Sequence, residues 1–343
     1  MNTPITICSS VQIKDFLKEI HQPAFRYKQI IEWLFIHRAT SYDQMTNLPK
    51  ALRDEFAEHL PLYVPKLHNR RVSQDGTRKY LFELHDGQMV ETVAIPSHGS
   101  KDRLTVCFST QVGCAMGCMF CATGHEGFTR NLGMAEIVYQ ILLAEDDMGM
   151  RVSNLVGMGQ GEPFLNFQNV LDALLILNDP KGIGIGARKI TVSTCGVIPG
   201  IQKFQDVRQQ FTMAVSLHSA IQEKRDQIMP KARKWPLHQL KRALREYLRT
   251  TDRRITFEYL LINGVNDGEE DLKALIDYCD GLLCHVNLLN MNAIEGSPFK
   301  PTGKKTIDAW LRRLESAGIE ATLRTSRGSD IEGACGQLKN ALS

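Results

Sequence analysis

The stretch RLTVCFSTQVGCAMGCMFCATG, residues 103–124, joins an apolar β-rich segment to a loop that holds three cysteines. Cys114, Cys118 and Cys121 are spaced C-x3-C-x2-C in a chain of 343 residues with nine cysteines. Thiolates are soft ligands that suit iron–sulfur clusters, zinc or copper(I). A structural zinc site and a complete [4Fe–4S] cluster each take four protein ligands. Three cysteines on one loop therefore predict a metal centre with one position left open.

A closed zinc site is the alternative interpretation of the three cysteines. It needs a fourth protein ligand, for instance His125 or Cys107. In that case the chain would be a zinc-containing, non-catalytic RNA-binding protein.

Strands and helices alternate regularly from the cysteine stretch onward. Apolar segments typical of buried strands recur at residues 103–110, 152–159, 188–196, 211–219, 254–262 and 284–292. Helical segments lie between them, which predicts an α/β fold with a parallel sheet. Six such units fall short of a closed eight-stranded barrel, so we expect a partial, TIM-like (β/α)6 barrel, with a doubly wound sheet as the alternative.

Three parts are expected along the chain. Residues 1–100 form a small helical accessory domain followed by a hairpin, whose turn is Asp86-Gly87. Residues 101–300 form the partial barrel. Residues 301–343 form a C-terminal extension with a helix, a strand and a mobile, glycine-rich tail.

Cysteine use and hydropathy restrict the class of protein. Clustered cysteines in a chain of this length indicate metal or redox chemistry in a reducing compartment rather than a disulfide scaffold. The sequence has no apolar run long enough for a bilayer, and its first residues lack the pattern of a signal peptide. We therefore expect a cytoplasmic monomer without membrane contact.

Positive charge is concentrated locally, because the formal net charge is only +3. Residues 231–254 contain nine basic and two acidic side chains, which suits either phosphate binding or a solvated helix face. In the N-terminal region, candidate phosphate contacts are Arg26, Lys28, Arg70, Arg71, Arg78 and Lys79.

Unusual polar segments end four of the expected strands. They are GQGEP (159–163), STCG (193–196), SLHS (216–219) and NMN (290–292). In βα-barrel enzymes the carboxyl ends of the strands form the rim of the active site. We therefore expect these four segments to meet at one mouth.

Several motifs resemble those of a single family. The cysteine spacing, with an aromatic residue before the last cysteine, is similar to that of radical S-adenosylmethionine (SAM) enzymes. VETVAIP (90–96), GFTRNL (127–132), GMGQGEP (157–163) and ACGQL (334–338) resemble the RlmN family of rRNA/tRNA adenine-C2 methyltransferases. A sister family, the chloramphenicol–florfenicol resistance methyltransferases, methylates C8 of the same rRNA adenosine. The Gly-Glu-Pro of GMGQGEP favours the C2 enzymes.

The resemblance implies an RNA methyltransferase with a [4Fe–4S] cluster and two molecules of SAM per turnover. Cys114, Cys118 and Cys121 would bind the cluster, and SAM would bind its fourth iron. The targets would be an adenosine in the peptidyl transferase centre of 23S rRNA and the adenosine 3′ to the anticodon of tRNA. An external donor such as flavodoxin or ferredoxin would supply electrons. C2 of adenine has no nucleophilic lone pair, so the family uses a protein thiol as methyl carrier.

The matching motifs also imply roles for individual residues. Cys335 would carry the methyl group as S-methylcysteine, and Cys107 would be the resolving thiol that forms a transient disulfide with it. Glu91 would be the proton acceptor. The expected contacts to SAM are Gly161, Glu162, Ser193, Ser216, Leu217, His218 and Asn292.

Overall fold

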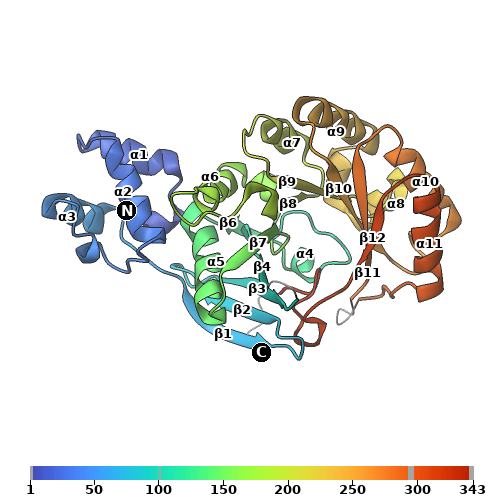
Figure 1. Ribbon diagram of the computed structural model, residues 1–343, viewed down its shortest axis with the longest axis horizontal. Coiled ribbons are helices and arrows are strands. Elements are labelled where there is room, and N and C mark those ends of the chain that lie inside the picture. The colour runs from blue at the N-terminus through green and yellow to red at the C-terminus, as the bar shows by residue number, and fades with distance from the viewer. Residues whose placement is uncertain (1–2, 100–101, 293–296, 340–343) are drawn as a thin grey trace.

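The computed structural model describes residues 3–99, 102–292 and 297–339, so the end of the expected tail lies outside the described residues. Its main sheet has ten strands in the order β1-β2-β3-β4-β7-β8-β9-β10-β11-β12 (Figure 1). Helices pack along the outside of the curved sheet, and three N-terminal helices project from one side. Within the described residues, no helix has the length and apolarity needed to cross a membrane.

Seven strands of this sheet are parallel. They are β4 (Arg103–Cys107), β7 (Val152–Gly157), β8 (Ile190–Thr194), β9 (Thr212–Ser216), β10 (Ile255–Leu261), β11 (Cys284–Asn290) and β12 (Ala321–Arg324). The six expected strands are confirmed, and β12 adds a seventh. Each parallel strand pairs with the next in chain order, whereas a doubly wound sheet reverses direction part-way, so the partial barrel is correct.

Helices lie between the successive parallel strands, as expected. They are α5 (Met134–Met148), α6 (Phe167–Asn178), α7 (Ile198–Gln205), α8 (Gln222–Ile228), α9 (Leu237–Thr251), α10 (Glu269–Cys279) and α11 (Lys304–Ser316). In α9 the side chains of Leu237, Leu240 and Leu244 are buried and the basic side chains lie on the other face. This pattern is that of an amphipathic helix on a barrel wall.

The N-terminal region contains α1 (Ser10–Glu19), α2 (Phe25–Phe35) and α3 (Lys50–His59). Ser9 caps α1, because its hydroxyl accepts a hydrogen bond from the backbone N–H of Gln12. Phe35 of α2 packs edge-on against Tyr139 of α5, with ring centroids 5.5 Å apart. This contact joins the helical region to the barrel.

The expected hairpin is part of the barrel sheet. β2 (Arg78–Glu83) and β3 (Met89–Ser97) are antiparallel, and β3 continues the sheet by pairing antiparallel with β4. An outer strand, β1 (Lys66–Val72), pairs with β2. The sequence did not predict it, because its side chains are nearly all exposed and do not alternate between apolar and polar. The Asp86-Gly87 turn is confirmed, with Gly87 at a φ of +77°.

Four of the candidate phosphate contacts instead pair with carboxylates, three of them joining this sheet extension to the rest of the chain and one, Lys79, joining β2 to β3 within it. Arg70 and Arg78 both pair with Asp147 at the end of α5. Arg71 lies 3.3 Å from a carboxylate oxygen of Glu332, and Lys79 lies 3.0 Å from Glu91 Oε1. Basic doublets in the sequence cannot reveal such partners, which are distant in the chain.

Candidate active site

The three cysteines lie on a loop between β5 (Gln111–Gly113) and β6 (Phe128–Asn131), which also contains the short helix α4 (Ala122–Glu126). Gly113 has a φ of +70°, and a Cβ there would lie 2.0 Å from the carbonyl oxygen of Gly127. The backbone N–H of Cys114 donates to that same oxygen at 2.7 Å. The loop therefore folds back tightly just before its first cysteine.

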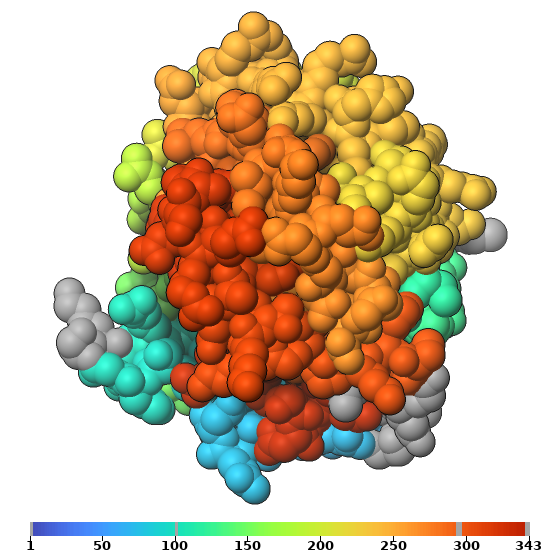
Figure 2. Space-filling view, turned by 90° about the vertical axis from the view of Figure 1, so that its right-hand side faces the viewer, coloured from blue at the N-terminus to red at the C-terminus, as the bar shows by residue number. Residues whose placement is uncertain are grey.

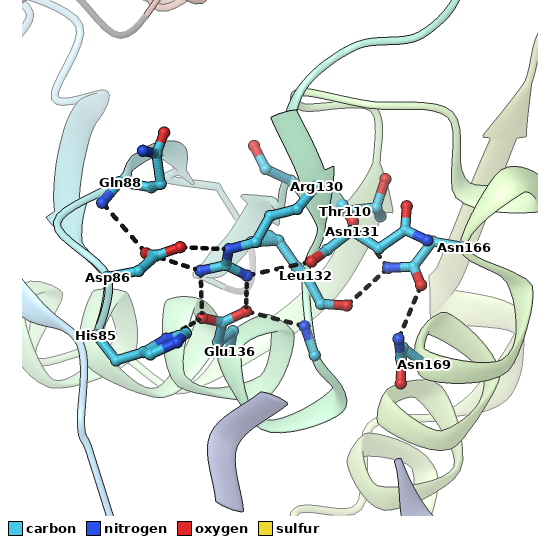
Figure 3. Close-up of polar contacts among 12 residues, drawn as sticks. His85, Asp86, Gln88, Thr110, Arg130, Asn131, Leu132, Glu136, Asn166 and Asn169 are labelled. Carbon is cyan, nitrogen blue, oxygen red and sulfur yellow. Dashed lines mark hydrogen bonds and ion pairs between the residues drawn. The ribbon is translucent and has the colours of Figure 1, made fainter. Parts of the chain in front are cut away.

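A single asparagine closes the neck of this loop (Figure 3). Nδ2 of Asn166 donates to the carbonyl oxygens of Thr110 and Leu132, at 2.9 and 2.8 Å. Nδ2 of Asn169 donates to Oδ1 of Asn166 and fixes the orientation of its amide. Asn166 is only 4% exposed, so these hydrogen bonds do not compete with bulk water.

Arg130 anchors the second strand of the loop (Figure 3). Its guanidinium donates two hydrogen bonds to Asp86 in the β2–β3 turn and two to the buried carboxylate of Glu136 in α5. Such fork-like pairs fix both distance and orientation. The cysteine loop is thus attached at its base to the hairpin turn, to α5 and to α6.

The cysteines share one cavity with the ends of the parallel strands. Its lining residues include Cys114, Cys118 and Cys121 together with Gly161, Glu162, Ser193, Ser216, His218 and Asn292. All four polar strand ends therefore meet at one mouth, as expected. His125 and Cys107, the two suggested zinc ligands, are not among the residues that line this cavity.

The residues around this cavity fit a cluster held by three thiolates. Burial raises the pKa of Cys114 to about 12 and that of Cys121 to about 11, so a cationic metal centre would have to stabilise the thiolates. The backbone of the loop packs so closely around Gly124 that no side chain would fit there, since a Cβ on Gly124 would lie 2.6 Å from the carbonyl oxygen of Cys118. Within the described residues, no three His, Cys, Asp or Glu side chains converge on the position of a single ion.

Hydrogen bonds fix the orientation of two buried polar side chains at the mouth, Glu162 and His218. The buried carboxylate of Glu162 accepts hydrogen bonds from the backbone N–H groups of Cys195 and Phe164, at 2.6 and 3.0 Å, while burial raises its pKa. Burial lowers the pKa of His218 to about 3, so the ring is neutral. Its Nδ1 accepts from the backbone N–H of Leu260 at 3.0 Å, which places the proton on Nε2.

The other expected SAM contacts differ in position. The hydroxyl oxygens of Ser193 and Ser216 lie 3.3 Å apart at the ends of β8 and β9. Leu217 is fully buried and is not among the residues that line the cavity. Its N–H donates to the carbonyl of Glu258, and its own carbonyl accepts from Arg225. Leu217 therefore stabilises the rim through its backbone without lining the cavity.

The C-terminal segment lies directly against the cysteine loop. The backbone N–H of Ala122 donates to the carbonyl of Gly336 at 2.7 Å, and the Thr123 hydroxyl donates to the carbonyl of Leu338 at 2.6 Å. Nδ2 of Asn292 donates to the carbonyl of Cys335 at 3.1 Å. The exposed Cys335 consequently lines the same cavity as the three loop cysteines.

Cys335 also lines a second cavity, whose lining includes Cys107. Cys107 is buried at the end of β4 and packs against Leu338. Burial, reinforced by the negative charge of a Cys335 thiolate, raises the pKa of Cys107 to about 12. Arg324 lines both cavities, and the charge of a Cys335 thiolate raises the pKa of its guanidinium.

Glu91 occupies a different position from the cysteine cavity. It lies on β3, is 2% exposed, pairs with Lys79 at 3.0 Å in a small pocket lined by β1, β2 and β3, and accepts a hydrogen bond from the backbone of Lys339 in the C-terminal segment. Burial raises its pKa to about 7, although the Lys79 ammonium acts in the opposite direction. A carboxyl group with this pKa can exchange a proton near neutral pH.

Comparison with known proteins identifies the family of the chain. Residues 108–278 match the family model of the radical SAM superfamily, and residues 8–62 match that of the ribosomal RNA large subunit methyltransferase N-terminal domain. A probable dual-specificity RNA methyltransferase RlmN from Clostridioides difficile is 44% identical over 333 residues, which are 96% of this chain and 95% of the relative. The chain belongs to the RlmN family.

Other RlmN relatives and one solved structure agree with this assignment. The RlmN protein of Akkermansia muciniphila is 43% identical and covers 98% of this chain and 95% of its own length. The crystal structure of a radical SAM methyltransferase from Sphaerobacter thermophilus has a TM-score of 0.88 at 40% identity, covering 99% of this chain and 100% of that one. Like other radical SAM enzymes, this RlmN-family chain uses a [4Fe–4S] cluster and SAM.

The sequence did not indicate the roles of several residues of the site. Arg324 is the last residue of a short, partly exposed strand, so nothing local marks it. Cys195 also lines the cavity and lies beside Cys118. The buried guanidinium of Arg225 donates to the carbonyls of Cys195 and Leu217 and so joins the ends of β8 and β9. A charged residue on an amphipathic helix normally faces solvent, which hid this role.

Proposed function

We propose that this chain methylates C2 of a specific adenosine in the peptidyl transferase centre of 23S rRNA and of the adenosine 3′ to the anticodon in tRNA. The single observation that carries the proposal is the position of Cys335, which lies between the cysteine cavity and the cavity of Cys107. An enzyme that acted without a methyl carrier would have no need for a thiol at this point.

The cluster and SAM together supply a methyl group and a carbon-centred radical when they are bound. Cys114, Cys118 and Cys121 would hold the cluster. Gly161, Glu162, Ser193, Ser216, His218 and Asn292 would orient SAM at the strand ends, with Leu217 supporting them. A neutral His218 and a hydrogen-bonded Glu162 form a polar wall that needs no rearrangement on binding.

Two thiols and one carboxylate would then act on the RNA. Cys335 would hold the transferred methyl group as a methylcysteine. Cys107 would attack the Cys335 sulfur and release the product as a transient disulfide forms. Glu91 would accept the ring proton. Its carboxylate accepts a hydrogen bond from the backbone of Lys339, four residues after Cys335, so it lies beside the segment that carries the methyl group.

An adenosine within folded RNA has to leave its base stack to reach this cavity. We infer that residues 1–100 help to hold the RNA, that residues 101–300 supply six parallel strands of the barrel, and that residues 301–343 add the seventh, β12, and present Cys335. The protein would act in the cytoplasm as a monomer, with an external one-electron donor such as flavodoxin or ferredoxin.

Nucleoside mass spectrometry tests this function. The anaerobically reconstituted protein is incubated with SAM, a reductant and either a 23S rRNA fragment or tRNA, and the RNA is digested to nucleosides. We expect 2-methyladenosine from both substrates. Formation of 8-methyladenosine would instead indicate the activity of the resistance methyltransferases, and an unmodified tRNA would restrict the function to rRNA.

A further inference from the structure

The cysteine loop has one face that points away from the active-site cavity. Met119 lies between Cys118 and Cys121 in the sequence and is 43% exposed, although it is apolar. It does not line the cavity. Met119 therefore marks the place where the chain between two ligands of the cluster reaches the surface, one peptide bond from Cys118.

A basic turn adjoins this face. The 3-10 helix η5 (Pro230–Lys234) carries Lys231, Arg233 and Lys234, all of which are exposed. In the described part of the chain, no carboxylate pairs with any of the three. By contrast, Lys224 on the preceding helix is held by two carboxylates, at 2.7 and 2.8 Å.

The cysteine loop lies against the end of α8 and the basic turn that follows it. The backbone N–H of Met119 donates to the carbonyl of Ile228 at 2.9 Å. The side chain of Lys231 lies alongside the loop, 4.0 Å from the position of a Cβ on Gly117. Figure 2 shows the yellow segment that contains η5 next to the green edge of the cysteine loop.

We propose that this donor face, formed by Met119, Lys231, Arg233 and Lys234, docks a small acidic protein that delivers single electrons to the cluster. The inference rests on the proposed function, which requires an external electron. Transient redox complexes bury little surface, and complementary charge beside the contact speeds their association. At this surface one electron leaves the reduced flavin or iron–sulfur centre of the donor and enters the chain's cluster, and no bond is formed or broken.

Charge alone would also suit RNA, but the position of the face favours a redox partner. The substrate has to reach Cys335, which lies on the cavity side of the loop together with Asn292. Met119 and the basic turn lie outside that cavity. A donor bound here would therefore leave the cavity free for the RNA.

Flavodoxin serves as the probe, with the triple variant K231Q/R233Q/K234Q and the control K304Q/K305Q. The control removes two exposed lysines at the start of α11, a helix of the outer wall. Binding of flavodoxin to each anaerobically reconstituted protein is measured by titration at low and moderate salt. Loss of three complementary charges should weaken binding by about tenfold in the triple variant at low salt and leave the control unchanged.

A second measurement compares SAM cleavage driven by reduced flavodoxin with cleavage driven by dithionite. The triple variant should be slower by about tenfold with flavodoxin and unchanged with dithionite, which needs no docking surface. M119S is the second variant and should show the same difference without any change of charge.

If the triple variant and M119S both bound flavodoxin with wild-type affinity, the proposal would be overturned. A loss of RNA affinity and of dithionite-driven methylation in the triple variant would also overturn it, because the face would then bind RNA. If the wild-type protein cleaved SAM with flavodoxin but left RNA unmethylated, the proposed function would fail while the docking surface would stand.

Discussion

Cys107 and Cys335 line one small cavity, although Cys107 is buried in the sheet and Cys335 is exposed on the C-terminal segment. The segment is attached to the cysteine loop and to Asn292 through its backbone carbonyls. This mode of attachment leaves the Cys335 thiol available for chemistry at the boundary between the cavities.

Replacing Cys335 by alanine should abolish methylation of RNA while the cluster remains. Removal of a covalent nucleophile is expected to lower the rate by more than about 1,000-fold. Transfer of labelled methyl groups from SAM to RNA measures the activity, and iron per chain measures the cluster. Cys284→Ala, at the start of β11, is the matched control and should keep full activity. Substantial methylation by Cys335→Ala would remove this thiol from the mechanism.

The rate of product formation should rise with pH through about 7 and then level off. Burial raises the pKa of Glu91 to about 7, and a proton acceptor works only in its deprotonated form, which dominates above that pH. Glu91→Gln should lower the single-turnover rate by about 100-fold to 10,000-fold, the usual contribution of a positioned base, and should abolish this rise. A variant that kept the wild-type rate and pH profile would show that another group takes the proton.

Lys79→Met should move the same pH profile to higher pH. The Lys79 ammonium, 3.0 Å from Glu91, favours the charged carboxylate and so lowers its pKa. Without this ammonium, burial acts unopposed and the pKa rises further. Lys66→Met changes an exposed lysine on the neighbouring strand and should leave the profile in place. An unshifted profile in Lys79→Met would mean that the ion pair does not control the base.

Asn166→Ala should weaken retention of the cluster. Two carbonyl oxygens at the neck of the cysteine loop would lose their partner, at a cost of about 1–3 kcal/mol for each buried group left unsatisfied. Iron per chain after exposure to a chelator measures the effect. Asn178→Ala is the control, because Asn178 also donates to a backbone carbonyl, that of Ile185, at the other end of α6. Equal iron loss in both variants would indicate general destabilisation.

The sequence was sufficient to predict the parallel strands and the meeting of their polar ends. Buried strands and amphipathic helices alternate in it, and the pairing of successive units brings Gly161, Ser193 and Ser216 to one edge. The cysteine spacing predicted an open metal centre because its three ligands are local in the chain.

Contacts between distant segments could not be predicted in the same way. Arg78 looked like a phosphate contact, but it pairs with Asp147 of α5. Arg324 and Asn166 act through partners far away in the chain, and only the folded sheet brings these together. Burial likewise determines the pKa of Glu91, and an alternating strand pattern does not specify which face is covered.

Mass spectrometry of the Cys107→Ala variant after reaction with RNA tests the central claim most directly. Without its resolving thiol, the protein should accumulate covalently attached RNA. After digestion, we predict a peptide that contains Cys335 joined through a single carbon to C2 of adenosine. Free 2-methyladenosine released at the wild-type rate, or an adduct on any residue other than Cys335, would contradict the account.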